Sequence, residues 1–455
     1  MYILHLLIYN RKKVNYMVDV SDDVFSDLFP QQGNIFKCEN LLSNTFVPKS
    51  LIARDKEVRE VAFNLSAVLR QGNPGNMYIW GDTGAGKTIT VRYVLNILAD
   101  GIKKQGKNIL VDVVTLDCTS VKNEIMACTE VLGQLSGVVI RQGLQFNQYL
   151  REIWDLIDKT AERYSFYTVV VFFDEIDKFN EPDNILYQLS RALSHQKIKG
   201  KNVAIEIILA SNQKDYLQKL DGKVLSSAAF HYCNFPDYNE EEIFQIIQMR
   251  KEAFLDDAVT DEIFRYCAKK IADKYHGDAR RAIDTIYEAG KIALFENAIC
   301  VTKDHIDAAE NAVNTRATTE MLQKISAHDR YLILSIHLAS MALTTVKGKL
   351  PPHSGIVNQV YKKICKLIGD SPNCDTHVSH RLGELGEKQL IHKYEIRGHG
   401  NTRFFSVTGD IIDVMDILYT PLLKAAIVKN YADIESIALS NAKIAHKNTG
   451  FINSE

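Results

Sequence analysis

The run from Gly81 to Thr88 constrains this chain more than any other part of its sequence. A short apolar run precedes it, and residues 89–99 follow with apolar side chains at helical spacing. Strand, glycine-rich loop and helix form the context in which backbone N–H groups wrap a phosphate. We therefore predict a P-loop whose members are Gly81, Asp82, Thr83, Gly84, Ala85, Gly86, Lys87 and Thr88.

The residue types in this loop match the needs of a nucleoside triphosphate. Lys87 would reach the β- and γ-phosphates, and the Thr88 hydroxyl would ligate Mg²⁺. The alternative is a flexible glycine turn followed by an unrelated lysine. The full motif in its expected context favours nucleotide binding.

Two carboxylates follow a second apolar run. Residues 168–173 are β-branched and aromatic, as in a buried central parallel strand, and they lead into Asp174 and Glu175. The carboxyl ends of parallel strands border the crevice where ligands bind. Asp174 would hold the Mg²⁺ shell and Glu175 would polarise the attacking water. The alternative, a solvated helix cap, is weakened by the P-loop upstream.

Two further polar positions suit the same site. Asn212 follows the apolar run 203–210, where it could hydrogen-bond the γ-phosphate or the water; a turn-forming Asn is the alternative. Asp278 is placed as a helix N-cap, with Arg280 and Arg281 in the first turn. Because cations there oppose the helix dipole, one arginine is expected to serve an anionic ligand, although two surface arginines remain possible.

Composition describes an ordinary soluble globular chain of about three domains. Its 455 residues are 46% hydrophobic and 24% charged, with a net charge of −2, so any nucleic-acid contact must come from local patches. Eight scattered cysteines without a Cys-x-x-Cys pair argue against a zinc site or a disulfide framework, and no membrane segment is expected.

We expect a disordered lead-in at 1–34, an α/β nucleotide domain at 35–235, a helical lid at 236–320, a winged helix at 325–425, and a final helix and tail at 426–455.

The C-terminal expectation rests on two apolar helices, a third helix from about Thr376, and two strand-like runs at 391–397 and 402–407. That order is typical of a winged helix-turn-helix, whose recognition helix enters the major groove while the hairpin follows the backbone. Residues 351–410 hold eight Lys and Arg against six Asp and Glu, a weak electrostatic signal, so a protein-binding winged helix is the alternative. The candidate DNA contacts are Ser379, His380, Arg381, Arg397, His399 and Arg403.

The combined motifs resemble the AAA+ ATPases. The flanking phrases 35–37, 47–55, 220–227 and 235–238 are similar to those of the archaeal origin-recognition and helicase-loader initiators, and the resemblance covers about residues 35–425. It implies Walker A roles for Lys87 and Thr88 and Walker B roles for Asp174 and Glu175. It further implies sensor roles for Asn212 and Arg280, a DNA-contacting insert near Arg141, and nucleotide contacts from Val47, Pro48, Arg54 and Tyr238.

One departure concerns Lys223, which stands where relatives usually carry arginine. Lysine lacks the planar fork of arginine, which puts an arginine-finger role in question.

The resemblance implies an ATP-dependent replication initiator in the cytoplasm, associated with the nucleoid. Its cofactors would be ATP, then ADP after slow hydrolysis, and Mg²⁺. Its partners would be double-stranded origin DNA, the replicative minichromosome maintenance helicase and paralogous initiator subunits. A clamp-loader-like ATPase that works by turnover in a ring is the main alternative, and an initiator that binds ATP without hydrolysing it is a third.

Overall fold

The computed structural model describes residues 35–43, 46–140, 143–343, 351–395 and 402–448. The expected lead-in at 1–34 lies outside these residues. The chain forms two compact units, which meet in the sequence between Ala309 and Glu310. That division falls within one helix, α11 (Lys303–Lys324), and not at the expected domain limits of 320 and 325.

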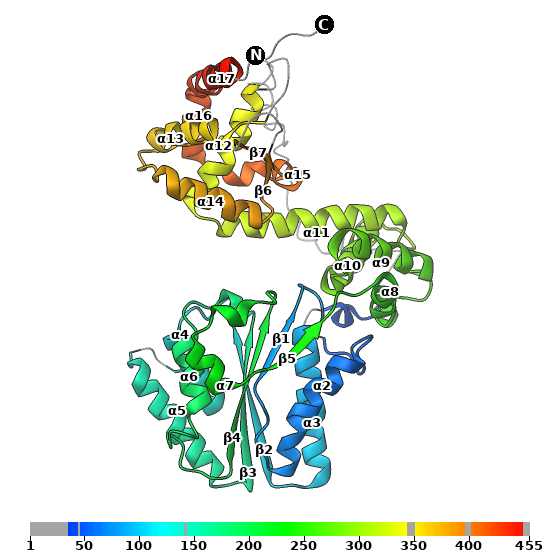
Figure 1. Cartoon of the computed structure of the whole chain (residues 1–455). Coiled ribbons are helices and arrows are strands. Elements are labelled where there is room, and N and C mark those ends of the chain that lie inside the picture. Colours follow the sequence, from blue (N-terminus) through cyan, green and yellow to red (C-terminus); the bar gives the residue numbers. More distant parts are fainter. Residues whose placement is uncertain (1–34, 44–45, 141–142, 344–350, 396–401, 449–455) are drawn as a thin grey trace, which may run out of the picture. The chain divides into compact units, whose positions relative to one another are not determined.

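One parallel sheet organises the first unit. Its strand order is β2-β3-β4-β1-β5 (Figure 1). Since β1 pairs with β4 and β4 pairs with β3, the carboxyl ends of these three strands meet at one edge, as the sequence predicted for the P-loop, Asn212 and Asp174. The bounds are β1 Met77–Gly81, β2 Ile109–Asp117, β3 Phe166–Asp174, β4 Val203–Ser211 and β5 His231–Phe235.

Helices cover both faces of this sheet (Figure 1). Along β3, Val170 and Phe172 pack in the core under α2 and α3, whereas Val171 and Phe173 pack in the core on the other face. A strand buried on both faces reads as a continuous apolar run, which confirms the interpretation of residues 168–173. The helices are α2 Asp55–Leu65 and α3 Lys87–Gln105 on one face, and α4 Glu124–Ser136, α5 Phe146–Ala161, α6 Asp183–Arg191 and α7 Gly222–Ala228 on the other.

The lid consists of α8 (Glu240–Gln248), α9 (Asp261–Tyr275), α10 (Ala279–Phe295) and the start of α11. Side chains from Ile35, Phe36 and Leu42 complete its core. Residues 35–43 therefore belong to the lid, and the chain crosses from there to the sheet, whereas the sequence predicts one α/β domain over residues 35–235. Short 3₁₀ turns occur at Glu39–Leu42, Ser66–Arg70, Ile176–Lys178, Tyr216–Lys219, Lys251–Ala253 and, in the second unit, Met415–Leu418.

The second unit has the helix, helix, helix, hairpin order of a winged helix. One core joins its helices and the β6–β7 pair, and it also includes Ile434 and Ala438 of α17. The limit expected at residue 425 lies inside α16, so the structured unit extends further than expected. The elements are α12 Ala327–Leu343, α13 Ser354–Ile368, α14 Asp375–Glu387, β6 Ile391–Glu395, β7 Arg403–Val407, α15 Gly409–Asp413, α16 Pro421–Lys429 and α17 Tyr431–Asn448.

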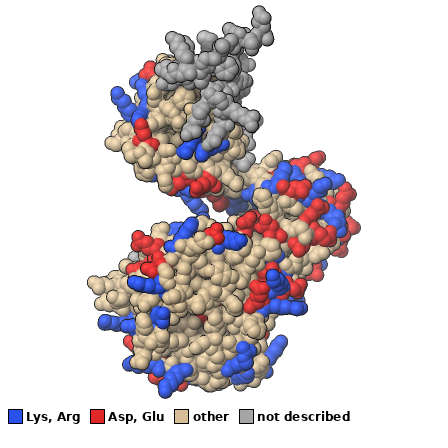
Figure 2. Space-filling model, in the orientation of Figure 1, with Lys and Arg blue, Asp and Glu red and all other residues tan. Residues whose placement is uncertain are grey.

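On the face shown in Figure 2, acidic and basic side chains are interspersed over the lid helices. The net charge of −2 gives the chain no overall attraction for an anionic partner, so binding of such a partner would depend on particular side chains.

Candidate nucleotide-binding site

The loop between β1 and α3 has the conformation that its glycines predict. Gly84 and Gly86 have φ angles of 76° and 88°, which residues with a Cβ rarely adopt. A Cβ on Gly84 would lie 1.9 Å from Asp278 Oδ1, and one on Gly86 would lie 2.6 Å from the Tyr238 hydroxyl. Glycine is therefore required both by the turn and by the close approach of the lid.

Lys87 ties this loop to the end of β4. Its ammonium donates to the carbonyls of Gly81 at 2.7 Å and Asp82 at 2.8 Å, and to Asn212 Oδ1 at 2.8 Å. Burial lowers the pKa of Lys87, while the carboxylates around it oppose that shift. The structure thus brings together Lys87 and Asn212, which the sequence placed at one site.

Thr88 and Asp174 form the candidate metal site. The Thr88 hydroxyl contacts Asp174 Oδ1 at 3.0 Å and Oδ2 at 2.8 Å. Burial raises the pKa of Asp174, and the Thr88 bond and the nearby Arg92 and Lys87 charges act against the shift. A hydroxyl beside one carboxylate suits Mg²⁺, which takes few protein ligands alongside phosphate and water. Within the described ranges, no cluster of three His, Cys, Asp or Glu could hold a metal by itself.

Glu175 lies next to this pair in a constrained backbone conformation. Glu175 has a φ of 54° just before the Ile176–Lys178 turn, and it lines the cavity. Burial raises the pKa of Glu175, and the neighbouring carboxylates of Asp174 and Asp177 raise it further. A carboxylate with a raised pKa beside the metal site has the properties of a general base.

Asp177 holds Asn212 in place, a role that the sequence did not reveal. Its Oδ1 accepts the Ser211 hydroxyl at 3.0 Å and the Asn212 N–H at 3.2 Å, and Lys178 pairs with Oδ2 at 3.0 Å. Burial by itself would raise the pKa of Asp177, but the bonds from Lys178 and Asn212 bring it below the ordinary value. Only its position soon after Glu175 could have suggested it.

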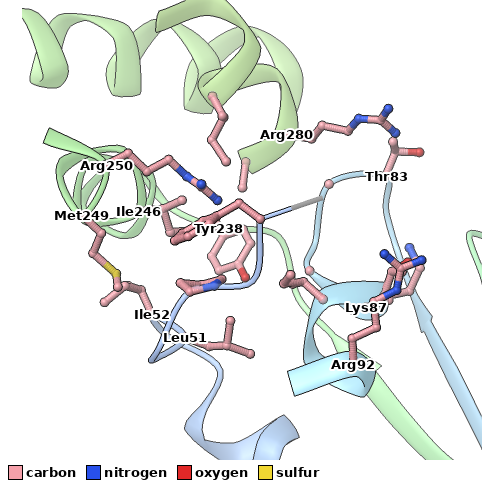
Figure 3. Close-up of a pocket in the computed structure, with 18 of the residues that line it drawn as sticks. Leu51, Ile52, Thr83, Lys87, Arg92, Tyr238, Ile246, Met249, Arg250 and Arg280 are labelled. Carbon is pink, nitrogen blue, oxygen red and sulfur yellow. The ribbon is translucent and has the colours of Figure 1, made fainter. Parts of the chain in front are cut away.

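A cavity of about 370 Å³ lies between the sheet edge and the lid, within the usual range for ligand sites. Figure 3 shows Lys87 and Arg92 at one end of it and Leu51, Ile52, Ile246 and Met249 at the other. Arg280 extends from the lid toward Thr83 of the loop (Figure 3). The predicted residues that line it are Pro48, Thr83, Gly84, Gly86, Lys87, Thr88, Asp174, Glu175, Asn212, Tyr238 and Arg280.

Arg54 is predicted as a nucleotide contact, but it does not line this cavity. Its side chain is 1% exposed; it donates to Ala85 O at 2.9 Å and to Pro236 O at 2.6 Å, and its guanidinium carbon stacks 3.6 Å from the centre of the Tyr238 ring. Arg54 thus braces the loop from behind. Val47, Gly81, Asp82 and Ala85 also lie outside the lining, whereas Phe46, Arg92, Arg250 and Ile283 line it without having been predicted.

In the second unit, the candidate DNA contacts differ in accessibility. Ser379, His380 and Arg403 are exposed. Arg381 instead turns inward from α14, donating to Asp329 Oδ1 at 2.8 Å and to Ser326 Oγ at 2.9 Å. This pairing argues against Arg381 as a free DNA contact.

Three predicted contacts, Arg141, Arg397 and His399, lie outside the described residues. Lys223 is exposed at the start of α7, after the N-cap Asp221.

Comparisons with known proteins agree with this geometry. Residues 70–218 match the AAA domain family, and residues 244–311 match the Cdc6 AAA+ ATPase-type lid domain. An ORC1-type DNA replication protein of Thermococcus kodakarensis is 31% identical over 384 residues, 82% of this chain and 88% of the relative. A second, from Haloarcula marismortui, is 29% identical and covers 86% and 93%.

Among solved structures, the Aeropyrum pernix ORC1 protein in complex with DNA matches with a TM-score of 0.71 at 24% identity, covering 84% of this chain and 96% of that one. Along the described ranges, no helix is both long and apolar enough to cross a membrane.

Proposed function

The chain belongs to the ORC1-type family of AAA+ replication initiators, and from this premise we propose that it is an ATP-switched initiator that binds origin duplex DNA and helps to load the replicative minichromosome maintenance helicase. It is an ATPase of the AAA+ class with a nucleotide-binding domain and a lid.

The observation that carries the proposal is the shared cavity. Thr83 and Lys87 come from the loop, Arg280 comes from the lid, and all three line the same space. A ligand shifts a conformational equilibrium only through contacts that differ between the states. A γ-phosphate near Arg280 would supply such a contact. When hydrolysis releases that phosphate, the Arg280 guanidinium on the lid loses its anionic partner.

Within this site we assign one task to each polar side chain. Lys87 binds the β- and γ-phosphates, and Thr88 and Asp174 hold Mg²⁺, which neutralises developing charge on the phosphates. Glu175 orients water and accepts its proton, Asn212 fixes the γ-phosphate side, and Arg280 contacts the γ-phosphate. The existing Lys87–Asn212 and Thr88–Asp174 contacts support this assignment, since they already place these groups within 3.0 Å of one another.

For DNA, we assign the exposed side of α14 to the major groove and the β6–β7 hairpin to the backbone. Ser379 and His380 are exposed on α14, and Lys393 and Arg403 are exposed on the hairpin. The described part of this surface also carries Glu384, whose Oε1 lies 3.5 Å from His380 Nδ1. Because few cations are available, phosphate neutralisation should be modest and binding should depend strongly on base contacts.

The experiment is a duplex-binding titration of the whole chain with ATP at several salt concentrations. An origin-like intergenic duplex would be compared with a scrambled duplex of equal length. We expect a preference for the former, and a decrease of about one in the log–log salt slope for Arg403→Ala, as for one lost phosphate contact. Equal affinity for all duplexes, with ATPase activity that appears only in a ring with other subunits, would instead identify a clamp-loader-like protein.

Helicase loading needs a separate assay. The minichromosome maintenance hexamer would be incubated with an origin duplex whose ends are blocked, and then washed with high salt. We expect salt-stable hexamers only when this chain and ATP are both present. Salt-stable loading in its absence would refute this part of the proposal.

A further inference from the structure

The segment that leads into the nucleotide domain is anchored in the lid. Lys37 N–H and Cys38 N–H donate to Ala253 O at 2.8 and 3.0 Å, and Leu255 N–H donates back to Ile35 O at 3.0 Å. The Phe36 ring lies 5.3 Å from that of Phe254. These bonds make residues 35–43 part of the lid, from which the chain passes along the cavity at residues 46–52.

Arg250 stands where this segment, the lid and the cavity meet. It follows α8, is 8% exposed, and lines the cavity together with Ile246 and Met249. Its Nη1 donates to Leu41 O, and its guanidinium carbon lies 5.2 Å from the centre of the Phe46 ring. Figure 3 shows the guanidinium extending from this helix toward Tyr238.

The donors of Arg250 exceed the acceptors that these contacts supply. A guanidinium has five N–H donors, and the Leu41 carbonyl takes one of them. Burial lowers the pKa of Arg250, because desolvation disfavours its charged form. Because Arg250 lines the cavity, an acceptor on a bound ligand could meet its remaining N–H groups there.

The surroundings also indicate which half of a nucleotide would meet Arg250. The phosphate groups belong at the loop, near Lys87 and Thr88. Arg250 instead lies among the apolar side chains of Phe46, Ile246 and Met249, which suit the flat faces of a base. An acceptor-bearing, largely apolar group fits this end of the cavity, and the nucleoside is that part of ATP.

We propose that Arg250 is a nucleoside-binding residue, which donates to acceptor atoms of the base or ribose while it ties the lead-in segment to the lid. This inference rests on the proposed assignment of the cavity to ATP. It gives the lid a second contact with the ligand, independent of the γ-phosphate contact of Arg280. The ADP-bound and ATP-bound forms would share this contact.

The test compares two ligands that differ only in the nucleoside. Calorimetry of the full chain with Mg²⁺ would measure the dissociation constants of ATP and of inorganic tripolyphosphate. For Arg250→Met we expect ATP to bind about 10- to 100-fold more weakly, the value of hydrogen bonds to a charged donor, and tripolyphosphate to bind within about twofold of the parent. The matched control is Arg265→Met, another lid arginine, which is paired with Glu241 at 2.9 Å and stacked on Phe244 outside the cavity; both affinities should stay unchanged.

The outcomes separate this inference from the function it rests on. If the parent chain does not bind ATP, the assignment of the cavity fails and the inference fails with it. If the parent binds ATP but Arg250→Met retains its affinity, or loses ATP and tripolyphosphate to the same extent, the nucleoside role alone is refuted. Should Arg250→Met not fold, Arg250→Lys decides by the same ratio, since it keeps the charge and loses the planar fork.

Discussion

The pairing of Arg381 with Asp329 yields the most specific prediction about the winged helix. Arg381 lies on α14, and Asp329 lies in the first turn of α12; their side chains are 20% and 10% exposed. Ser326 completes the cluster, because its hydroxyl accepts from Arg381 at 2.9 Å and donates to Asp329 Oδ2 at 2.8 Å. The cluster therefore holds the helix that we assign to the major groove against the body of its unit.

The magnitude follows from burial. Removing one partner of a fully buried ion pair costs about 3–5 kcal/mol, because the other charge remains desolvated and unpaired. Since both side chains keep some contact with water, we expect Arg381→Ala to lower the unfolding free energy of the second unit by about 2–3 kcal/mol. Arg381→Ala combined with Asp329→Ala should cost less than the two single losses together, with a coupling of about 1–2 kcal/mol.

Urea unfolding of the full chain measures these values through the transition assigned to the second unit. Duplex binding then separates the two interpretations of Arg381. A residue that only positions α14 leaves the log–log salt slope unchanged, whereas a phosphate contact reduces the slope by about one when it is removed. Normal stability of Arg381→Ala together with a reduced slope would refute the positioning role.

Three further predictions concern the first unit. Burial raises the pKa of Glu206 from 4.5 to about 8, so the stability this group contributes is complete below pH 4.5 and is lost as the pH rises toward 8. The unfolding free energy of Glu206→Gln should therefore equal that of the parent near pH 4.5 and exceed it by about 3 kcal/mol at pH 7. Urea unfolding at a series of pH values measures this difference, and a difference that does not change with pH would contradict the prediction. Gly84→Ala would bring a Cβ to 1.9 Å from Asp278 Oδ1, and we expect it to weaken ATP binding at least about tenfold in calorimetry. An unchanged affinity would show that Asp278 can move away from the loop at little cost. Glu175→Gln should keep ATP affinity within about twofold and lower the rate of phosphate release at least about 100-fold, an expectation that a normal rate would exclude.

Local pattern was sufficient for the sheet and for the loop and strand-end residues that meet at its edge. The apolar run ending in Asp174 and the glycine loop ending in Lys87 each determine their own strand end or loop. The parallel α/β architecture then brings Asp174, Lys87 and Asn212 to one edge, and the observed 2.8 Å Lys87–Asn212 contact follows from it.

The sequence was less informative wherever a side chain's partner lies far away in the chain. Arg54 stands in a phrase typical of a nucleotide-binding segment, yet it braces Ala85 and Pro236 from behind the loop. Arg381 has the spacing of a recognition-helix residue, but Asp329, on another helix, captures it. Arg250 has no motif of its own, and its place at the cavity depends on the end of α8 and on its bond to Leu41 O, in the segment that packs into the lid. In each case the direction of a long cationic side chain is set by tertiary acceptors, which no local pattern encodes.

The nucleotide is proposed to control the affinity for duplex DNA through the contact between Arg280 of the lid and the γ-phosphate. The most direct measurement is the affinity of the full chain for an origin-like duplex with ATP and with ADP, made on the parent and on Arg280→Ala at ATP concentrations that saturate both. We expect the parent to bind the duplex with different affinities in the two nucleotide states, and Arg280→Ala to bind it equally in both. Equal affinities in the parent, or a full difference that persists in Arg280→Ala, would contradict the account.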